Sequence, residues 1–569
     1  MRLSVAERPI TATAVLIGTY VGLAAAAMSA QGVLVERFFH DIYVPIDYAW
    51  RSALGQVPHL DYHTPIGQAF TWPFRLLALA EPASPLMIVH AGVLVGGILL
   101  LIALAGLPRR LAPPLFLLTG VGAIAIAMSP RDLDAFWYIY SHNAPYNRWG
   151  HGVLVLLAAM TLLPRRGEGG AGWVPDGLLI GLMCGLLLYL KINFLMGAIG
   201  FVLLGAALRQ LDWRAIPVAV LVVAAMIGTV ELLFGNNRAY LGDLALAASV
   251  NRDGLLARLW GRDLLQTVAI GSVFVAVGMG VIWLLQPVRS VAEAVRSWWK
   301  PSLLLAGTVG IATVVHTQNN FTREVPPFLV AVIVVAEVQR RRMRDAGTRR
   351  GRDPGPMRRA LAWTLVGVVG GTTPLLDAMS VVDHAVATHG LDAGAIPALR
   401  GTAGETLLVS RRLMRDFPDR PGLRKAGAEA LLPPNSLAQR RRRWRALTAM
   451  EVRSLAEAMR LLRPHVRPGD VVFAVDFANP YPAFLRLPPP PGALTWWHID
   501  RSFSATVHPD LDRMVDATTF VIQKRIDTQA GPHGEVLWPV IRSAVEARHG
   551  IVAQGELWTL WRARTRTGG

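Results

Sequence analysis

Long apolar runs dominate the first two thirds of this 569-residue chain. A hydrocarbon core about 30 Å thick needs roughly 20 apolar residues in each helix that crosses it. The chain supplies about eleven such runs before residue 382, and each predicts a membrane-spanning helix. The fourth and fifth runs are short, which indicates tilting or extension into the loops. The predicted spans are 10–35, 84–106, 112–129, 151–163, 177–191, 194–208, 213–234, 264–285, 302–316, 325–338 and 360–381.

The connections between these runs form two alternating sets. One set is rich in arginine, and the positive-inside rule places it in the cytoplasm. The other is richer in Asp, Asn, His, Tyr and Trp and is predicted to face the bacterial periplasm. The arginine-rich set is 107–110, 164–170, 209–214, 286–300 and 339–359. The opposite set is 36–73, 130–150, 192–193, 236–263 and 317–324.

The first run has two interpretations. Basic residues precede it and small residues close it near Ala30, as in a cleavable secretory signal. We favour an uncleaved first span of an inner-membrane protein with a cytoplasmic N-terminus. The following loop is translocated in both cases, so the remaining topology is the same.

The pattern changes after the last run. Helical spacing covers 436–466, short apolar strands are predicted at 471–477, 518–524 and 555–563, and a proline loop occupies 487–492. The predicted fold is therefore an all-α membrane bundle of about 11 transmembrane helices, residues 1–383, plus a C-terminal periplasmic α/β domain, residues 384–569.

Composition narrows the function classes. Charged residues make up 17% of the chain, against about 25% in soluble proteins. The net charge of +18 does not indicate nucleic-acid binding, because the basic residues lie in the short loops between spans. Cys184 is the single cysteine, so no disulfide within the chain is possible. The sequence contains no GxxxxGK[ST], HExxH or GxSxG motif, so phosphate-driven transport and serine or zinc hydrolysis lose support.

Acidic residues are dense in the first external loop, 36–73. A carboxylate at the membrane face can accept the proton of a sugar or lipid hydroxyl during attack on an anomeric carbon. Asp47 is the first candidate for this base, Asp61 the second and Asp41 the third. The alternative is that these acids cap helices or pair with Arg37 and Arg51.

His59 and His63 flank Asp61 in the same loop. They could orient the acid, or the three side chains could share one face of a strand and hold a divalent metal. Pro58 and Pro65 argue against a regular strand, so no metal site is assigned and a metal stays the alternative.

The other external loops carry candidate substrate-binding groups. An arginine can hold a phosphate with its planar fork, and amides suit sugar hydroxyls. The alternatives are an aromatic belt, a snorkelling lysine and groups that satisfy open helix ends. Asp132 and Asp134 form a pair of acids two residues apart, which is a weaker functional candidate. The substrate-binding candidates are Asp41, His59, His63, His142, Asn143, Tyr146, Asn147, Arg148, Lys191, Arg238, Gln318, Asn319 and Arg323.

Four stretches resemble bacterial members of the GT-C superfamily of membrane glycosyltransferases: IDYAWRSALGQVPHLDYHTPIG, YNRWG, NNFTREVPP and DFANPYPAFL. The superfamily includes aminoarabinose, mannosyl and arabinofuranosyl transferases that use polyprenyl-phosphate sugars. The resemblance implies a catalytic base at Asp47 or Asp61 and a phosphate clamp drawn from Arg148, Lys191 and Arg323. It implies transfer to a glycan, lipid or protein acceptor of the cell envelope.

Two other functions stay open at this point. One is a transporter or flippase of lipid-linked glycans, and the other is a polymerase or ligase of surface glycans. Transporters often carry internal repeats and mid-membrane charges, whereas the polar clusters of this chain lie on one predicted side.

Overall fold

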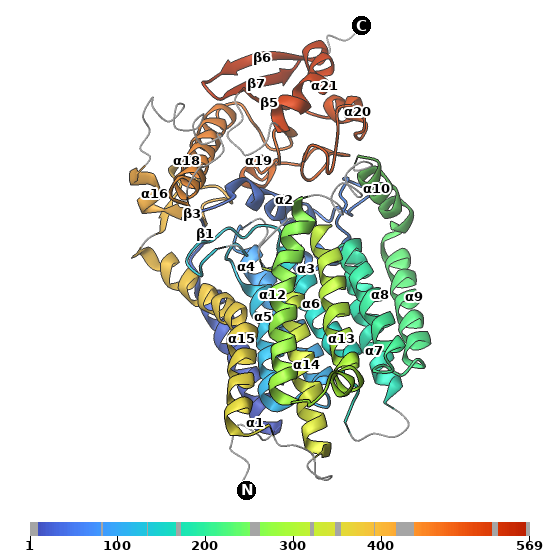
Figure 1. The fold of residues 1–569 in the computed structure, drawn as a ribbon. Helices are drawn as coiled ribbons and strands as arrows, with labels where there is room; N and C mark the ends of the chain where they lie inside the picture. Colours follow the sequence, from blue (N-terminus) through green and yellow to red (C-terminus); the bar gives the residue numbers. More distant parts are fainter. Residues whose placement is uncertain are drawn as a thin grey trace.

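The computed structural model describes residues 9–80, 84–133, 135–166, 172–250, 262–318, 324–346, 354–391, 393–416, 437–525 and 533–564. A bundle of long helices forms one part, and the C-terminal residues cover one end of it (Figure 1). Short elements of the first external loop lie between the two. The predicted helical membrane bundle with a C-terminal α/β region is confirmed.

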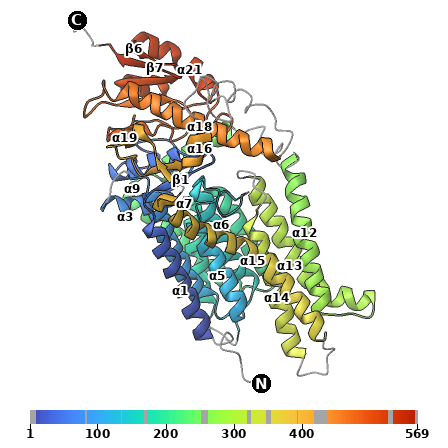
Figure 2. The same cartoon turned by 90° about the vertical axis from the view of Figure 1, so that its left-hand side faces the viewer.

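Each of the eleven predicted runs lies wholly or mostly in one helix. The helices are α1 (Pro9–Ser29), α4 (Met87–Gly106), α5 (Pro113–Met128), α6 (Pro145–Leu162), α7 (Trp173–Leu190), α8 (Ile192–Ala207), α9 (Ala215–Phe234), α12 (Arg262–Leu285), α13 (Val291–Thr317), α14 (Pro326–Ala346) and α15 (Pro356–Val386). Among the described residues, seven helices are long and apolar enough to cross a membrane, and α5 and α8 are apolar but shorter. Figure 2 shows α1 at one edge of the bundle and α12 at the other.

Three predicted boundaries are wrong. The first helix ends at Ser29, and the last residues of the predicted span form strand β1 (Val33–Val35). Most of the predicted loop 286–300 is the start of α13. In addition, α6 begins at Pro145, where the fixed φ of proline suits a first helical turn. That start places Tyr146, Asn147 and Arg148 on a helix rather than in a loop.

Close helix packing rests on small residues. A Cβ added to Gly177 of α7 would meet the carbonyl oxygen of Ala215 at 2.6 Å, and one added to Gly181 would meet that of Ala219 at 2.6 Å. Four-residue spacing of small residues is the pattern that lets two membrane helices approach closely. The pair α7 and α9 therefore packs backbone to backbone at these positions.

The arginine-rich connections meet at the end of the bundle away from the C-terminal residues. Glu337 is fully buried, and its carboxylate accepts hydrogen bonds from Arg166 at 2.5 Å, Arg340 at 2.9 Å and Arg341 at 2.8 Å. The side chain of Arg341 also donates to the carbonyl of Pro164 at 2.9 Å. The two sets of loops therefore occupy opposite ends, as the sequence predicted.

Two small sheets complete the other end. In the first, β1 pairs in parallel with β3 (Leu407–Ser410), which pairs antiparallel with β2 (Ala393–Ala395). Residues far apart in the sequence are thus joined in one sheet. The remaining short elements here are η2 (Phe39–Ile42), α2 (Tyr43–Ala53), η3 (Gln68–Phe70), α3 (Trp72–Ala78), α10 (Asn237–Val250), η4 (Ala387–Leu391), η5 (Pro397–Leu399) and α16 (Arg411–Asp416).

The C-terminal region contains a four-stranded sheet of order β4-β5-β7-β6. The pair β4 and β5 is parallel and the other pairs are antiparallel. Its helix at 437–462 and strands at 472, 520 and 558 fall where the sequence predicted them, whereas α21 and β6 were not predicted. The elements are α18 (Leu437–Leu462), β4 (Val472–Val475), α19 (Tyr481–Leu485), α20 (Leu511–Asp516), β5 (Phe520–Lys524), α21 (His533–Arg548), β6 (His549–Gln554) and β7 (Trp558–Ala563).

Candidate active site

The first external loop is fixed in place just before Asp41. The backbone N–H of Glu36 donates to the carbonyl of Tyr140 at 2.9 Å, and Thr448 of α18 donates to the carbonyl of Glu36 at 3.0 Å. Phe39 and Ile42 are buried, so the short helix η2 is anchored by two apolar side chains. Asp41 lies between them, with a quarter of its side chain exposed.

The surroundings of Asp41 change its acidity. Burial and the nearby charge of Asp132 raise the pKa of Asp41 to about 7, and the positive charge of Arg501 opposes them. The neighbouring His40 packs edge-on against Phe477, with ring centroids 5.1 Å apart. Burial, followed by the charges of Lys524 and His498, lowers the pKa of His40 to about 3, so its ring is neutral. Asp41 is therefore a partly open carboxyl that is half ionised near neutral pH.

Asp47 has a different environment. Its side chain is on α2 and is 1% exposed. One carboxylate oxygen accepts a hydrogen bond from Nε of Arg51 at 2.8 Å, four residues later on the same helix. Burial raises the pKa of Asp47, although the charge of Arg51 opposes the change. The structure thus places the first-ranked base in a buried ion pair, the alternative that the sequence left open.

Asp61, the second-ranked base, closes a turn. Its carboxylate accepts a hydrogen bond from the backbone N–H of Val57 at 2.6 Å, and the residue is exposed. This is the local side-chain-to-backbone bond that aspartate commonly makes in turns. The geometry gives Asp61 a structural role in the loop.

His59 and His63 both contact Asp243, a residue of α10 that the sequence analysis did not name. Nδ1 of His59 lies 2.8 Å from one carboxylate oxygen, and Nδ1 of His63 lies 2.7 Å from the other. The backbone N–H of Thr64 donates to the same carboxylate at 2.9 Å. Within the described part of the chain, no group of three or more His, Cys, Asp or Glu side chains has metal-ligand geometry. The contacts of His59, His63 and Thr64 with Asp243 join α10 to the first loop.

A buried ion cluster lies beneath the second external loop. Arg131 is fully buried and donates to Asp377 of α15 at 2.7 Å and to Glu324 at 2.9 and 2.5 Å. One cation thus serves two carboxylates. The second oxygen of Asp377 has no hydrogen-bond partner among the described residues. An acid within the predicted span 360–381 was the sequence signal for this cluster, because a charge inside a membrane helix requires a partner.

Arg148 of α6 is a second buried cation near this ion cluster. It is 2% exposed, and both terminal guanidinium nitrogens lack a hydrogen-bond partner within the described residues. The charges of Asp377, Asp132 and Glu324 act on it, as does that of Arg131. Leaving a buried guanidinium without hydrogen bonds is costly. Arg148 therefore has two terminal nitrogens with unused hydrogen-bond donors at a buried position.

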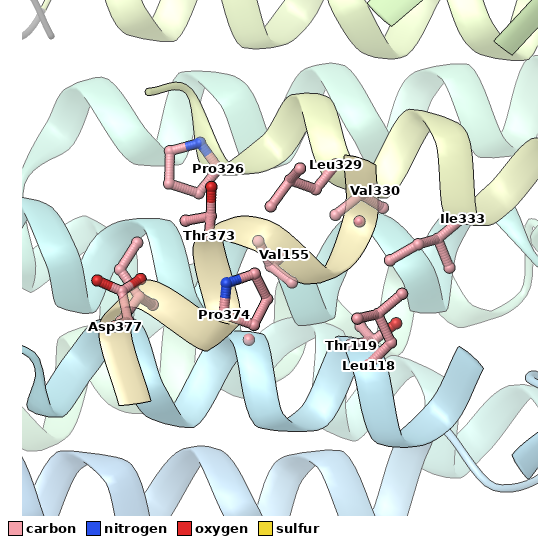
Figure 3. Close-up of a pocket in the computed structure, with 13 residues that line it drawn as sticks. Leu118, Thr119, Val155, Pro326, Leu329, Val330, Ile333, Thr373, Pro374 and Asp377 are labelled. Atoms are coloured by element: carbon pink, nitrogen blue, oxygen red, sulfur yellow. The ribbon is translucent and has the colours of Figure 1, made fainter. Parts of the chain in front are cut away.

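An apolar pocket reaches this cluster from within the bundle. Asp377 is the one charged group of its lining, and Thr119 and Thr373 are its other polar side chains. Figure 3 shows Asp377 at one side of the pocket, beside Thr373 and Pro374 of α15. The pocket lies between α5, α6, α14 and α15, so apolar walls adjoin the charged groups.

The start of α6 also places two further candidates together. Nζ of Lys191, the residue between α7 and α8, donates to the side-chain oxygen of Asn147 at 3.0 Å. The same ammonium lies 5.1 Å from the ring centroid of Tyr146. Lys191, which the sequence placed in a different loop, is thus a neighbour of Tyr146 and Asn147.

The remaining candidates lie in several places. Nε2 of His142 is 3.2 Å from Nε2 of His384, and burial and that neighbour hold the pKa of His142 well below its usual range. Asn143 accepts a hydrogen bond from Ser141 at 2.9 Å. Arg238 is exposed on α10, and the backbone carbonyl of Gln318 accepts from the side chain of Asn193 at 2.8 Å. These contacts are structural.

Three sequence candidates, Asn319, Arg323 and Asp134, lie outside the described residues.

The fold and these contacts define a multi-pass helical membrane protein with its polar site at the end that the C-terminal region covers. No family model and no curated protein matches the chain. Among solved structures, the chain is similar to the crystal structure of ArnT from Cupriavidus metallidurans bound to undecaprenyl phosphate. The sequence identity is 12% and the TM-score 0.44, with 98% of each chain covered.

Proposed function

We propose that this protein is a glycosyltransferase of the GT-C type. It moves a sugar from a polyprenyl-phosphate donor to an acceptor of the cell envelope, and Asp41 is the base. The observation that carries the proposal is the partly exposed carboxyl of Asp41 in the first external loop, where burial and the charge of Asp132 raise its pKa to about 7. A general base works best when its pKa is near the working pH.

Asp41 replaces Asp47 and Asp61 in this proposal for a physical reason. A base must touch the hydroxyl from which it takes the proton, and Asp47 is 1% exposed and paired with Arg51. Asp61 is exposed, but its carboxylate is occupied by the turn at Val57. Asp41 combines a partly exposed carboxyl with a raised pKa.

In the proposed reaction Asp41 acts on the acceptor. Its carboxylate accepts the proton of the acceptor hydroxyl, and the acceptor oxygen attacks the anomeric carbon of the sugar. The bond from that carbon to the phosphate oxygen breaks, and polyprenyl phosphate leaves. A single displacement inverts the anomeric configuration.

Two cations support the leaving phosphate in this proposal. Arg148 offers guanidinium nitrogens that have no hydrogen-bond partner within the described residues, and the ammonium of Lys191 donates to the side chain of Asn147, the residue before Arg148. Fixed cations stabilise charge that develops in a transition state. On this proposal the site faces the periplasm, and the arginine-rich end is cytoplasmic.

The test is a transfer assay with the full-length protein in nanodiscs and a panel of polyprenyl-phosphate sugars, with membrane extract as acceptor. Asp41→Asn is expected to reduce turnover roughly 10²–10⁴-fold while donor binding is kept. Asp61→Asn is the matched control from the same loop and should retain activity. Normal turnover of Asp41→Asn would remove this residue from the role. Absence of transfer and of donor hydrolysis with every sugar would favour the transporter, to be examined by flux of lipid-linked glycans.

A further inference from the structure

A segment of the C-terminal region, residues 492–497, is hydrogen-bonded directly to the first external loop. The N–H of Gly492 donates to the carbonyl of Asp61 at 2.8 Å, and the N–H of His63 donates to the carbonyl of Ala493 at 3.0 Å. The N–H of Thr495 donates to the carbonyl of His63 at 3.3 Å. Three backbone bonds thus fix this segment at the mouth of the bundle.

The two adjacent tryptophans of this segment have different environments. Trp497 is 1% exposed and packs against Phe473 and Phe503 in the core of the C-terminal region. Its backbone N–H donates to the carbonyl of Phe477 at 2.6 Å. Trp496 is half-buried and lies instead against the bundle. Since Trp497 is anchored in the core, the position of Trp496 is fixed from both sides.

Trp496 faces Tyr146 of α6. The two rings are parallel to within 7°, with centroids 6.2 Å apart, and Tyr146 is also half-buried. Lys191 lies 5.1 Å from the centroid of Tyr146, and its ammonium donates to Asn147. Two half-open aromatic rings, an ammonium and an amide are therefore gathered at one place.

These groups match the chemistry of a sugar ring. A sugar presents a face of C–H groups, which packs on an indole or phenol, and a rim of hydroxyls, which bind amides and ammonium groups. From this arrangement we infer that Trp496 and Tyr146 form the platform on which a sugar ring of the substrate rests, with Lys191 and Asn147 beside it. The inference rests on the proposed transferase function and extends it to the C-terminal region.

A second observation connects the segment to the base. The positive charge of Arg501, five residues after Trp496, acts on Asp41. His498 lies between them in sequence, and its ring packs on Phe477, the residue that also contacts His40. The part of the chain that carries the platform thus also borders Asp41, so a sugar on the platform is close to the base.

The sugar belongs to the donor or to the acceptor, and the test separates the two. Wild type, Trp496→Leu and Trp496→Phe are compared in nanodiscs for retention of the polyprenyl-phosphate sugar and of bare polyprenyl phosphate, and for the KM of the acceptor. Trp561→Leu is the matched control, because Trp561 is also half-buried in the C-terminal region but packs against Trp538. Thermal melting of each variant checks folding.

A donor platform predicts that Trp496→Leu weakens retention of the glycosylated lipid about tenfold, the scale of one aromatic contact, with bare lipid phosphate unchanged. An acceptor platform predicts unchanged donor retention and an acceptor KM raised about tenfold. Trp496→Phe should restore most of either loss. The inference is overturned if Trp496→Leu behaves as Trp561→Leu does, or if it weakens both lipids equally. If the wild type neither binds nor transfers any sugar, the proposed function falls, and this inference falls with it.

Discussion

Lowering the pH from 8 to 6 is expected to slow sugar transfer about tenfold through Asp41 alone. The pKa of Asp41 is about 7, so roughly nine tenths of the carboxyl is ionised at pH 8 and about one tenth at pH 6. The rate of a step that needs the ionised base follows this fraction. An ordinary aspartate, with a pKa of about 3.9, would be ionised throughout this range and would give a flat profile of rate against pH.

The same reasoning gives the direction of two shifts. The negative charge of Asp132 contributes to the raised pKa of Asp41, and the positive charge of Arg501 opposes it. Arg501→Gln should therefore raise the pKa and move the acid limb of the profile to higher pH. Asp132→Asn should lower the pKa and move the limb to lower pH, provided that the variant still folds without the ion pair to Arg37.

The assay is kcat/KM for the donor at pH values from 5 to 9, in nanodiscs of one lipid composition. The profile of kcat/KM reports ionisation in the free enzyme, which is the state that the structure represents. A flat profile between pH 5 and 8 would refute the reasoning. So would an unchanged acid limb in the residual activity of Asp41→Asn.

Three further predictions concern buried charges. Asp47→Asn should lower the free energy of unfolding by about 3 kcal/mol, because it leaves Arg51 buried without its counter-charge. The acid limb of the pH–rate profile should stay in place. A stable variant that lost this limb would make Asp47 the base. Asp243→Asn should speed hydrogen exchange in α10. Burial raises the pKa of Asp243, but the hydrogen bonds from the first loop have the larger combined effect, so the pKa is lowered overall. The stabilisation is therefore present above the ordinary aspartate pKa and is lost as the pH falls through the lowered value. Unchanged hydrogen exchange in the variant would contradict this. Lys524→Met should cost about 3–5 kcal/mol in thermal unfolding, because it removes the buried cation that pairs with Asp476 and Glu451. Arg542→Met, which breaks an exposed pair, should change stability by less than about 1 kcal/mol, and equal effects of the two variants would count against the argument.

Local sequence determined the helices and the two ends of the bundle. The apolar run 112–129 became α5 (Pro113–Met128), and the helical spacing near 436–466 became α18 (Leu437–Leu462). Hydropathy and helical period are properties of neighbouring residues, so they can be seen without the fold. Alternation of arginine-rich and polar loops likewise follows from the order of spans alone.

Only the tertiary structure decided which polar residues work together. Arg131 meets Asp377, 246 residues later, and His59 meets Asp243, 184 residues later. Trp496 reaches Tyr146 only because the C-terminal region folds back onto the first loop. No local pattern records such contacts, because the chain between the partners carries no signal of where it returns.

The choice among the first-loop acids shows the same limit. The four-residue spacing from Asp47 to Arg51 is visible in the sequence, and this spacing places two side chains on one face wherever the chain is helical. Burial of that pair, and the partial exposure of Asp41 beside Asp132, were not visible. The pKa of a carboxyl depends on its desolvation and on the charges around it. The sequence therefore determined that several acids lie in this loop, and the tertiary structure determined which of them is buried in an ion pair and which is partly exposed with a raised pKa.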